Sequence, residues 1–187
     1  MAILKIARMG HPVLSKVAAP VDDPRSEDVA RLVEDMLETL DDIGGLGLAA
    51  PQVHVPKRVV IFHLPAARAL AEDGEAGAVE MTVLINPVIE PLSEDKNSGW
   101  EGCLSVPGLR GLVPRYSHIR YTGVGLDGEP IDREARDFHA RVLQHECDHL
   151  DGVLYPQRMT DMKWLVFESE LKHVMAAAAD EREAVEA

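Results

Sequence analysis

The five residues His145-Glu146-Cys147-Asp148-His149 constrain this chain more than any other feature of its sequence. Residues four apart lie one turn above each other on the same face of an α-helix, so two histidines at this spacing can bind one metal ion. Glu146 is rotated by about 100° from His145 and borders the same pocket, where a carboxylate can act as a general base. We predict a helix from about Glu134 to Leu150, and the alternative is a pair of surface histidines beside a solvated glutamate.

Two histidines leave such a site incomplete, because a catalytic metal is usually held by three protein ligands with one position open for water. A third histidine six residues after the second one is ruled out, since Tyr155 stands at that position. Glu168 or Glu170 could complete the site from a later helix, as in thermolysin-like peptidases.

Cysteine offers another third ligand. Cys147 would lie about 200° around the helix from His145 and point away from the metal. Cys103, within Glu101-Gly102-Cys103-Leu104-Ser105, could bind a metal as a thiolate. A buried, inert cysteine is the other interpretation of this position.

Composition limits the kinds of protein that could carry this motif. The chain has 187 residues, 46% of them hydrophobic, which fits one domain over residues 1–187 with a C-terminal helix and tail from about 161. Its formal net charge of −13 opposes binding to nucleic acid, and no apolar run is long enough to cross a membrane. Two cysteines and no visible signal peptide favour the cytoplasm of a bacterial-type cell, with an organelle as the alternative.

Hydrophobic spacing predicts strands in runs, with helices toward the ends of the chain. This order is typical of an α+β fold and unlike a parallel βαβ fold. Asp127-Gly128 is a strong signal for a hairpin turn. Residues 66–77 are mostly small or acidic, which is typical of an exposed loop. The predicted helices are Ser26–Leu40, closed by Gly44-Gly45, then about 134–150 and about 161–178; the predicted strands are 58–64, 82–90 and 118–126.

A third segment, Gly45-Leu46-Gly47-Leu48-Ala49-Ala50-Pro51-Gln52, changes the interpretation of the other two. Alone it resembles a turn that leads into a strand, and it lacks the ending of a phosphate-binding loop. Together the three segments resemble the peptide deformylase family, which carries Gly-aliphatic-Gly-aliphatic-Ala-Ala-x-Gln, Glu-Gly-Cys-Leu-Ser and Gln-His-Glu-x-x-His-Leu in this order. The similarity covers about 4–160 and is closest to the type I branch; it also includes Gly10-His11-Pro12-Val13-Leu14, Pro107, Arg110, Pro114 and Arg115.

This resemblance implies a fold and a metal site. The fold would be α+β, with antiparallel sheets wrapped around the motif helix. Cys103, His145 and His149 would hold the metal. In this family the metal is typically Fe2+, although Zn2+, Ni2+ or Co2+ can take its place.

The resemblance also implies an activity, the hydrolytic removal of the formyl group from N-formylmethionine of new polypeptides, with release of formate. Glu146 would be the general base and proton shuttle. Gln52 and the backbone N–H of Leu104 would stabilise the oxyanion, where losing one donor typically costs about 10²–10³ in rate.

N-formylmethionyl peptides are therefore the expected substrates. The Leu46-Gly47 segment can accept a peptide as an added strand, with Gly102 on the other side. Arg110 could reach the peptide backbone or be a surface arginine. The methionine pocket should include Leu46 and Val142.

The sequence leaves the role of one residue and the contact with one partner open. Asp148 is either a group that fixes a neighbour of the metal site or an exposed helix acid. The ribosome is a candidate for transient contact, although the C-terminal tail is acidic where a basic helix would suit RNA.

Two other functions fit the metal motif. One is a small zinc peptidase with Glu168 as the third ligand, which would leave Gln52 and the glycine segment unexplained. The other is a non-catalytic metal-binding protein, for which a closed site with four ligands would be expected.

Overall fold

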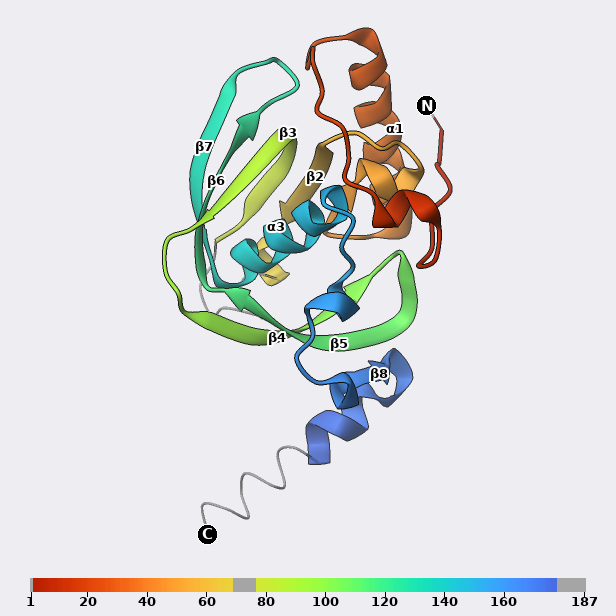
Figure 1. Ribbon diagram of the computed structural model, residues 1–187, viewed down its shortest axis with the longest axis vertical. Helices are drawn as coiled ribbons and strands as arrows, with labels where there is room; N and C mark the ends of the chain where they lie inside the picture. The colour runs from red at the N-terminus through yellow and green to blue at the C-terminus, as the bar shows by residue number, and fades with distance from the viewer. Residues whose placement is uncertain (1, 69–76, 178–187) are drawn as a thin grey trace.

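The computed structural model describes residues 2–68 and 77–177. Within them, two antiparallel sheets surround helix α3 (Asp137–Leu150), and helix α1 (Glu27–Ile43) lies to one side (Figure 1). This arrangement confirms the predicted α+β fold around the motif helix. The five-stranded sheet has the order β1 (Gly47–Ala49), β2 (Val59–Leu64), β3 (Val79–Pro91), β6 (His118–Val124) and β7 (Pro130–Arg136). The three-stranded sheet has the order β4 (Lys96–Cys103), β5 (Val106–Tyr116) and β8 (Leu165–Phe167).

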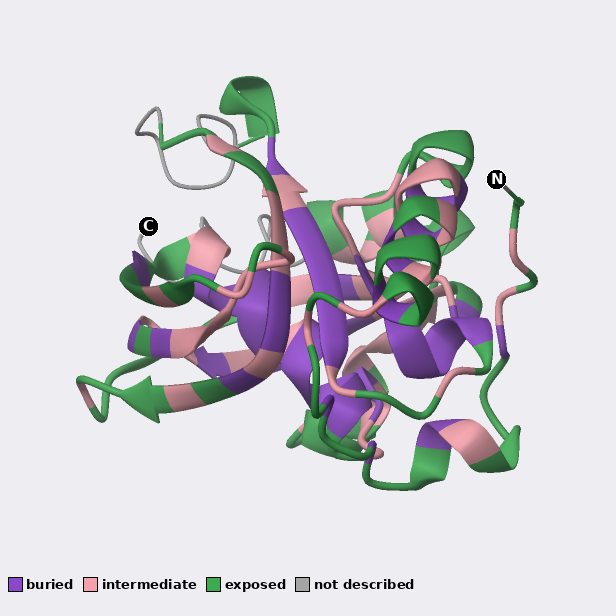
Figure 2. Ribbon diagram, turned by 90° about the horizontal axis from the view of Figure 1, so that it is seen from above, coloured by how far each residue is buried: buried purple, intermediate pink, exposed green. Residues whose placement is uncertain are grey.

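The five-stranded sheet is covered on both faces, which explains why β2 is almost entirely apolar. Val60 and Phe62 pack in the core cluster that contains α3 residues, whereas Val59 and Ile61 pack in the cluster that contains α1 residues. Successive side chains of a strand point to opposite faces, so one strand serves both clusters. Figure 2 shows buried residues gathered in the middle of the molecule and exposed residues around it.

The first predicted helix is confirmed, but α1 begins one residue later than expected, at Glu27, and runs three residues further, to Ile43 and not Leu40. Its fully buried residues recur at helical spacing: Val29, Val33, Met36, Thr39 and Leu40. Gly44 ends the helix with φ of 76°, a left-handed conformation that glycine adopts without strain. The Gly44 N–H donates to the Leu40 carbonyl at 2.9 Å.

The motif helix is also confirmed, but it begins at Asp137 and not at about 134. Residues up to Arg136 belong to β7, where Glu134 pairs with Arg120 of β6. The hairpin between these strands turns at Asp127-Gly128 as predicted, with Gly128 at φ of 82°. Pairing with the neighbouring strand therefore outweighs the local preference of these charged residues for a helix.

Strands β4 and β5 were not predicted. Their sequences contain the glycines and prolines that usually mark turns. The structure shows what three of these glycines do, because a Cβ at Gly99, Gly102 or Gly111 would lie 2.5–2.8 Å from the side chains of Arg141, Arg110 or Met159, respectively. Large side chains approach the backbone of these strands closely, so glycine stands where a typical strand would carry a larger residue. The usual alternation of a strand is therefore missing from this part of the sequence.

The predicted C-terminal helix over 161–178 is mostly wrong. Residues 165–167 form β8, flanked by two short 3-10 helices, and an α-helical stretch covers only 171–177. The apolar run Leu165-Val166-Phe167 extends the sheet at the open edge of β5, a tertiary partner that local spacing does not reveal. Residue 178, like 69–76 of the predicted loop over 66–77, lies outside the described residues.

His139 makes the free energy of unfolding depend on pH under acidic conditions. Its ring centroid lies 5.9 Å from that of Phe62 and 5.7 Å from that of Tyr121, and its buried Nε2 has no hydrogen-bond partner among the described residues. Burial, and then the charge of Arg133, lowers the pKa of His139 from 6.5 to about 4. The unfolded chain therefore binds more protons at this residue between these two values, and stability falls as the pH falls through that window.

We expect His139→Phe to remove this part of the acid sensitivity. Between about pH 6.5 and pH 4, the free energy of unfolding of the original protein should fall faster than that of the variant, by up to about 1.4 kcal/mol per pH unit. Chemical denaturation over this range measures the difference. Parallel curves for the two proteins would contradict the assignment.

Candidate metal centre

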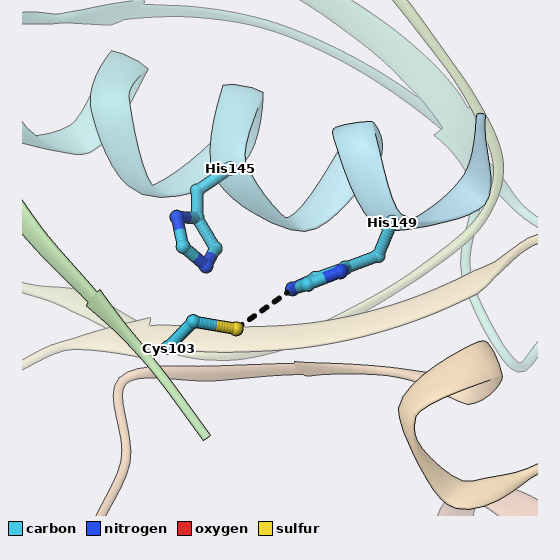
Figure 3. A group of neighbouring side chains, drawn as sticks. All are labelled: Cys103, His145 and His149. Atoms are coloured by element: carbon cyan, nitrogen blue, oxygen red, sulfur yellow. Dashed lines mark hydrogen bonds between the residues drawn. The ribbon is translucent and has the colours of Figure 1, made fainter. Parts of the chain in front are cut away.

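The side chains of Cys103, His145 and His149 converge, with one ligand atom of each within 4.8 Å of the others. Cys103 ends β4, and both histidines project toward it from α3 (Figure 3). Its Sγ lies 3.3 Å from His149 Nε2. A sulfur and a nitrogen bound to one tetrahedral ion at about 2.3 and 2.0 Å would be about 3.5 Å apart. The three residues therefore fit a divalent metal ion.

The other ligand candidates lie outside this group. Glu168 accepts hydrogen bonds from Arg110, and Glu170 is exposed beside Ser169. Cys147 is buried and lines a separate hollow behind α3. Among the described residues, Cys103 is thus the third ligand that the structure brings to the two histidines.

Glu101 orients the first histidine, a role that the sequence analysis missed. Its Oε2 lies 2.8 Å from His145 Nδ1, which leaves the other ring nitrogen for a metal. Arg115 donates two hydrogen bonds to Glu101, at 2.9 and 3.0 Å, and Arg141 donates one at 2.9 Å. Although burial opposes ionisation, hydrogen bonds from His145 and Arg115 hold the pKa of Glu101 well below its usual value. The carboxylate is therefore charged.

Asp148 continues this network toward the surface. Its Oδ2 accepts a hydrogen bond from Arg115 at 2.6 Å, and its Oδ1 accepts one from Arg158 at 2.7 Å. Asp148 is buried, so it is not an exposed helix acid. It fixes Arg115, which in turn binds Glu101.

Glu146 is buried against the glycine segment. A Cβ at Gly47 would lie 2.5 Å from its Oε1, so only glycine leaves room for the carboxylate. The other oxygen, Oε2, has no hydrogen-bond partner among the described residues. Burial raises the pKa of Glu146 to about 7, which leaves the group able to gain and lose a proton near neutral pH.

Gln52 presents its amide N–H group to the cysteine. Its Oε1 accepts a hydrogen bond from the Ala49 backbone N–H at 2.9 Å, and since a backbone N–H can only donate, this contact fixes the orientation of the amide. Gln52 Nε2 then lies 3.5 Å from Cys103 Sγ and 3.3 Å from Ser105 Oγ. Gln52 and Leu104, the next residue after Cys103, line one cavity beside the cysteine.

The centre opens into a cavity of about 750 Å³. Strands β1 and β4 each stand at one end of their sheet order, so each has one edge that no strand of the described residues covers. The cavity is lined from both strands, and it contains the predicted substrate-binding residues Leu46, Gly47, Gly102, Arg110 and Val142. The backbone groups along the free edges of β1 and β4 are of the kind that form hydrogen bonds with an extended peptide.

Further residues of the site escaped the sequence analysis. Tyr155 stacks on the ring of His145 with centroids 6.2 Å apart. His63 Nε2 lies 3.0 Å from the Gly45 carbonyl and steadies the glycine segment. For Glu101 a signal was available, because residues two apart in a strand share a face and Glu101 stands two before Cys103. No signal of this kind marks Tyr155 or His63.

Comparison with known proteins relates the whole site to one family. The family model described as polypeptide deformylase matches residues 3–164. Peptide deformylase 1 of Bordetella pertussis is 54% identical over 157 residues, which cover 84% of this chain and 88% of that protein. Peptide deformylase 2 of Pseudomonas syringae pv. tomato is 47% identical over 181 residues, or 96% and 99% of the two chains.

Solved structures give the same result. The Met-Ala-Ser-bound class I type b peptide deformylase from Acinetobacter baumannii has a TM-score of 0.76 at 36% identity and covers 84% of this chain and 98% of that one. The actinonin complex of peptide deformylase from Ehrlichia chaffeensis has a TM-score of 0.78 at 33% identity, with coverage of 87% and 92%.

We expect Glu101→Gln to weaken both metal binding and folding. The change removes the buried negative charge that Arg115 and Arg141 share, while Arg115 keeps its contact with Asp148, and this should reduce the free energy of unfolding by about 3 kcal/mol. Loss of the charged partner of His145 should reduce metal affinity by about 10- to 100-fold. Denaturation curves and metal titration measure the two effects.

Asp132→Asn is the matched control, because Asp132 pairs with Arg120 on the exposed side of the β6–β7 hairpin. It should alter neither stability nor metal affinity appreciably. Unchanged metal affinity in Glu101→Gln would remove Glu101 from the role of orienting His145.

Proposed function

The chain belongs to the peptide deformylase family of metal-dependent hydrolases, which remove the N-formyl group from new polypeptides, and on this premise we propose how its residues carry out the reaction. The observation that carries the proposal is the convergence of Cys103, His145 and His149 next to the buried Glu146, whose Oε2 has no hydrogen-bond partner within the described part of the chain. This arrangement supports a site with three protein ligands and a neighbouring base.

Cys103, His145 and His149 hold the ion in this proposal, with Glu101 orienting His145. A divalent metal at this position polarises a carbonyl oxygen and lowers the pKa of water. We propose Fe2+ as the native metal, with Zn2+, Ni2+ or Co2+ able to replace it. Relative affinity alone would not select iron, so availability and geometry must do so.

Glu146 moves the proton. It accepts a proton from the water that attacks the formyl carbon and delivers it to the nitrogen of the departing amine, as the C–N bond breaks. The products are formate and a peptide with a free N-terminal methionine. The raised pKa of Glu146, about 7 through burial, suits a group that must both accept and release a proton at neutral pH.

Gln52 and Leu104 stabilise the negative charge that develops on the formyl oxygen. The contact of Gln52 Oε1 with Ala49 directs Nε2 toward the metal ligands, and this supports its role as a donor. The backbone N–H of Leu104 is the second donor. Donors fixed before the reaction need little reorganisation when charge develops, and each is typically worth about 10²–10³ in rate.

The substrate binds as an extended strand between the free edges of β1 and β4. Gly47 and Gly102 permit a close approach of the peptide backbone. The methionine side chain enters the apolar part of the cavity, lined by Leu46, Phe138 and Val142. The solved complex of the Acinetobacter baumannii relative with Met-Ala-Ser supports a peptide substrate of this length and sequence.

We place this activity in the cytoplasm, where new polypeptides carry formylmethionine, with transient contact to the ribosome. No helix within the described residues has the length and apolar character needed to span a membrane. The net charge of −13 argues against a broad affinity for nucleic acid, so any ribosomal contact should be local.

The decisive experiment is anaerobic purification followed by metal analysis and an assay of formate release from formyl-Met-Ala-Ser. Stoichiometric metal and rapid formate release are expected. A metal-loaded protein that releases no formate would instead favour the non-catalytic metal-binding alternative.

We expect Glu146→Ala to keep the metal and lose turnover. Loss of the proton acceptor should reduce kcat by at least about 10²–10⁴. Glu129→Ala, in the exposed turn of the β6–β7 hairpin, is the control and should behave like the original protein. Retained deformylation by Glu146→Ala at full metal content would exclude Glu146 as the base.

We expect Cys103→Ser and Glu168→Ala to differ sharply in metal content. A serine hydroxyl is a poor anionic ligand, so Cys103→Ser should bind less metal or a different one. Glu168→Ala should retain its metal, because Glu168 binds Arg110 and is not one of the three converging residues. The opposite pattern, measured by elemental analysis, would favour the zinc peptidase alternative.

A further inference from the structure

Glu168 stands at the mouth of the substrate cavity, and the proposed reaction gives it no role. It lines the cavity together with Arg110, and the two side chains form an ion pair in which Glu168 is 55% exposed and Arg110 is 35% exposed. Asp41 and Arg68 are other charged residues that line the cavity. The cavity lining therefore carries charges of both signs, and the Arg110–Glu168 pair decides whether a substrate meets an unpaired positive charge beside Gly102.

The Arg110 guanidinium is divided between Glu168 and the edge of β4. Its Nε donates to Glu168 Oε1 at 3.0 Å, and its Nη2 donates to the same oxygen. Nη1 is the atom nearest to Gly102, since a Cβ at that position would lie 2.5 Å from it. Arg110 thus keeps one nitrogen beside the strand edge that we propose for substrate binding, while Glu168 offsets its positive charge.

The C-terminal segment holds Glu168 in this place. Strand β8, which ends one residue before Glu168, pairs with β5 so that Val166 lies opposite Arg110. The ring of Trp164, the residue before β8, also meets the ring of Trp100 of β4 edge to face, with centroids 6.4 Å apart. Glu168 is therefore positioned by a sheet and not by a free loop.

This geometry has a consequence for substrate choice. In the proposed binding mode an extended peptide lies along the edge of β4 beside Gly102, with its residues spaced by about 3.3 Å, so a residue that follows methionine comes close to Arg110. In a growing polypeptide the third residue presents a neutral carbonyl, whereas in a free tripeptide it presents a carboxylate. An unpaired arginine would favour the carboxylate, and an arginine paired with Glu168 would not.

We propose that Glu168 is a specificity-determining residue that disfavours short peptides with a free carboxylate relative to continuing chains, by neutralising Arg110 at the cavity mouth. This inference rests on the proposed function. It assigns Glu168 no part in the bond-breaking step.

The test compares formyl-Met-Ala-Ser with its C-terminal amide. Glu168→Gln preserves the shape of the side chain and an oxygen that can accept from Arg110, but removes the charge. In this variant the ratio of kcat/KM for the acid to that for the amide should rise about two- to fivefold over the original protein. The change should lie in KM and should disappear at high salt, because the charges are half-exposed.

Two further variants make the outcome decisive. Glu170→Gln removes a nearby exposed charge that does not line the cavity, and it should leave the acid-to-amide ratio of the original protein unchanged. In Arg110→Gln/Glu168→Gln the raised ratio should be lost, because the unpaired positive charge is gone.

An acid-to-amide ratio that is the same in Glu168→Gln and in the original protein would overturn the proposal. So would a rise that persists in the double variant. Formate release from the amide by the original protein tests the proposed function separately, so failure of one proposal is distinguishable from failure of the other.

Discussion

The structure depends above all on the buried carboxylate of Glu101. It joins three elements, since it lies on β4, accepts from Arg115 of β5, and contacts Arg141 and His145 of α3. Burial of charged groups is costly unless each is paired, and here every oxygen of Glu101 has two partners. Replacing such a network by apolar residues often does not destabilise a protein, so stability alone does not explain it. Its function is positional, because it holds one histidine of the metal centre in a single tautomer and orientation.

Glycines provide the space that this chemistry requires. Gly47 leaves room for Glu146, Gly99 for Arg141 and Gly102 for Arg110, with less than 3 Å available for a Cβ at each position. A strand rich in glycine is weaker and harder to recognise, so the site is built from elements with poor local strand signals. Tertiary contacts, and not strand propensity, therefore hold the backbone of the strands that line the cavity.

Two sheets with free edges meet across the metal centre, and this arrangement joins catalysis to binding. Strand β1 belongs to the five-stranded sheet and β4 to the three-stranded sheet, while α3 packs against both sheets and carries two of the proposed ligands and the proposed base. A peptide that pairs with these edges is thereby aligned with Glu146. The C-terminal segment adds β8 to the second sheet and places Glu168 against Arg110 beside the cavity.

Local sequence patterns were enough to predict those elements that depend on residues close together in the chain. The spacing of His145 and His149 predicted the ligand helix, the apolar period of α1 predicted that helix, and Asp127-Gly128 predicted the hairpin. Residue spacing alone left Cys103 and Glu168 as alternative third ligands, and the resemblance to the family favoured Cys103. Both residues are distant in sequence from the histidines, so only their packing shows that Cys103 meets them. Packing also makes 165–167 a strand and brings Tyr155 and His63 to the site. A partner far along the chain leaves no periodic trace in either segment, which is why these contacts could not be predicted from local spacing.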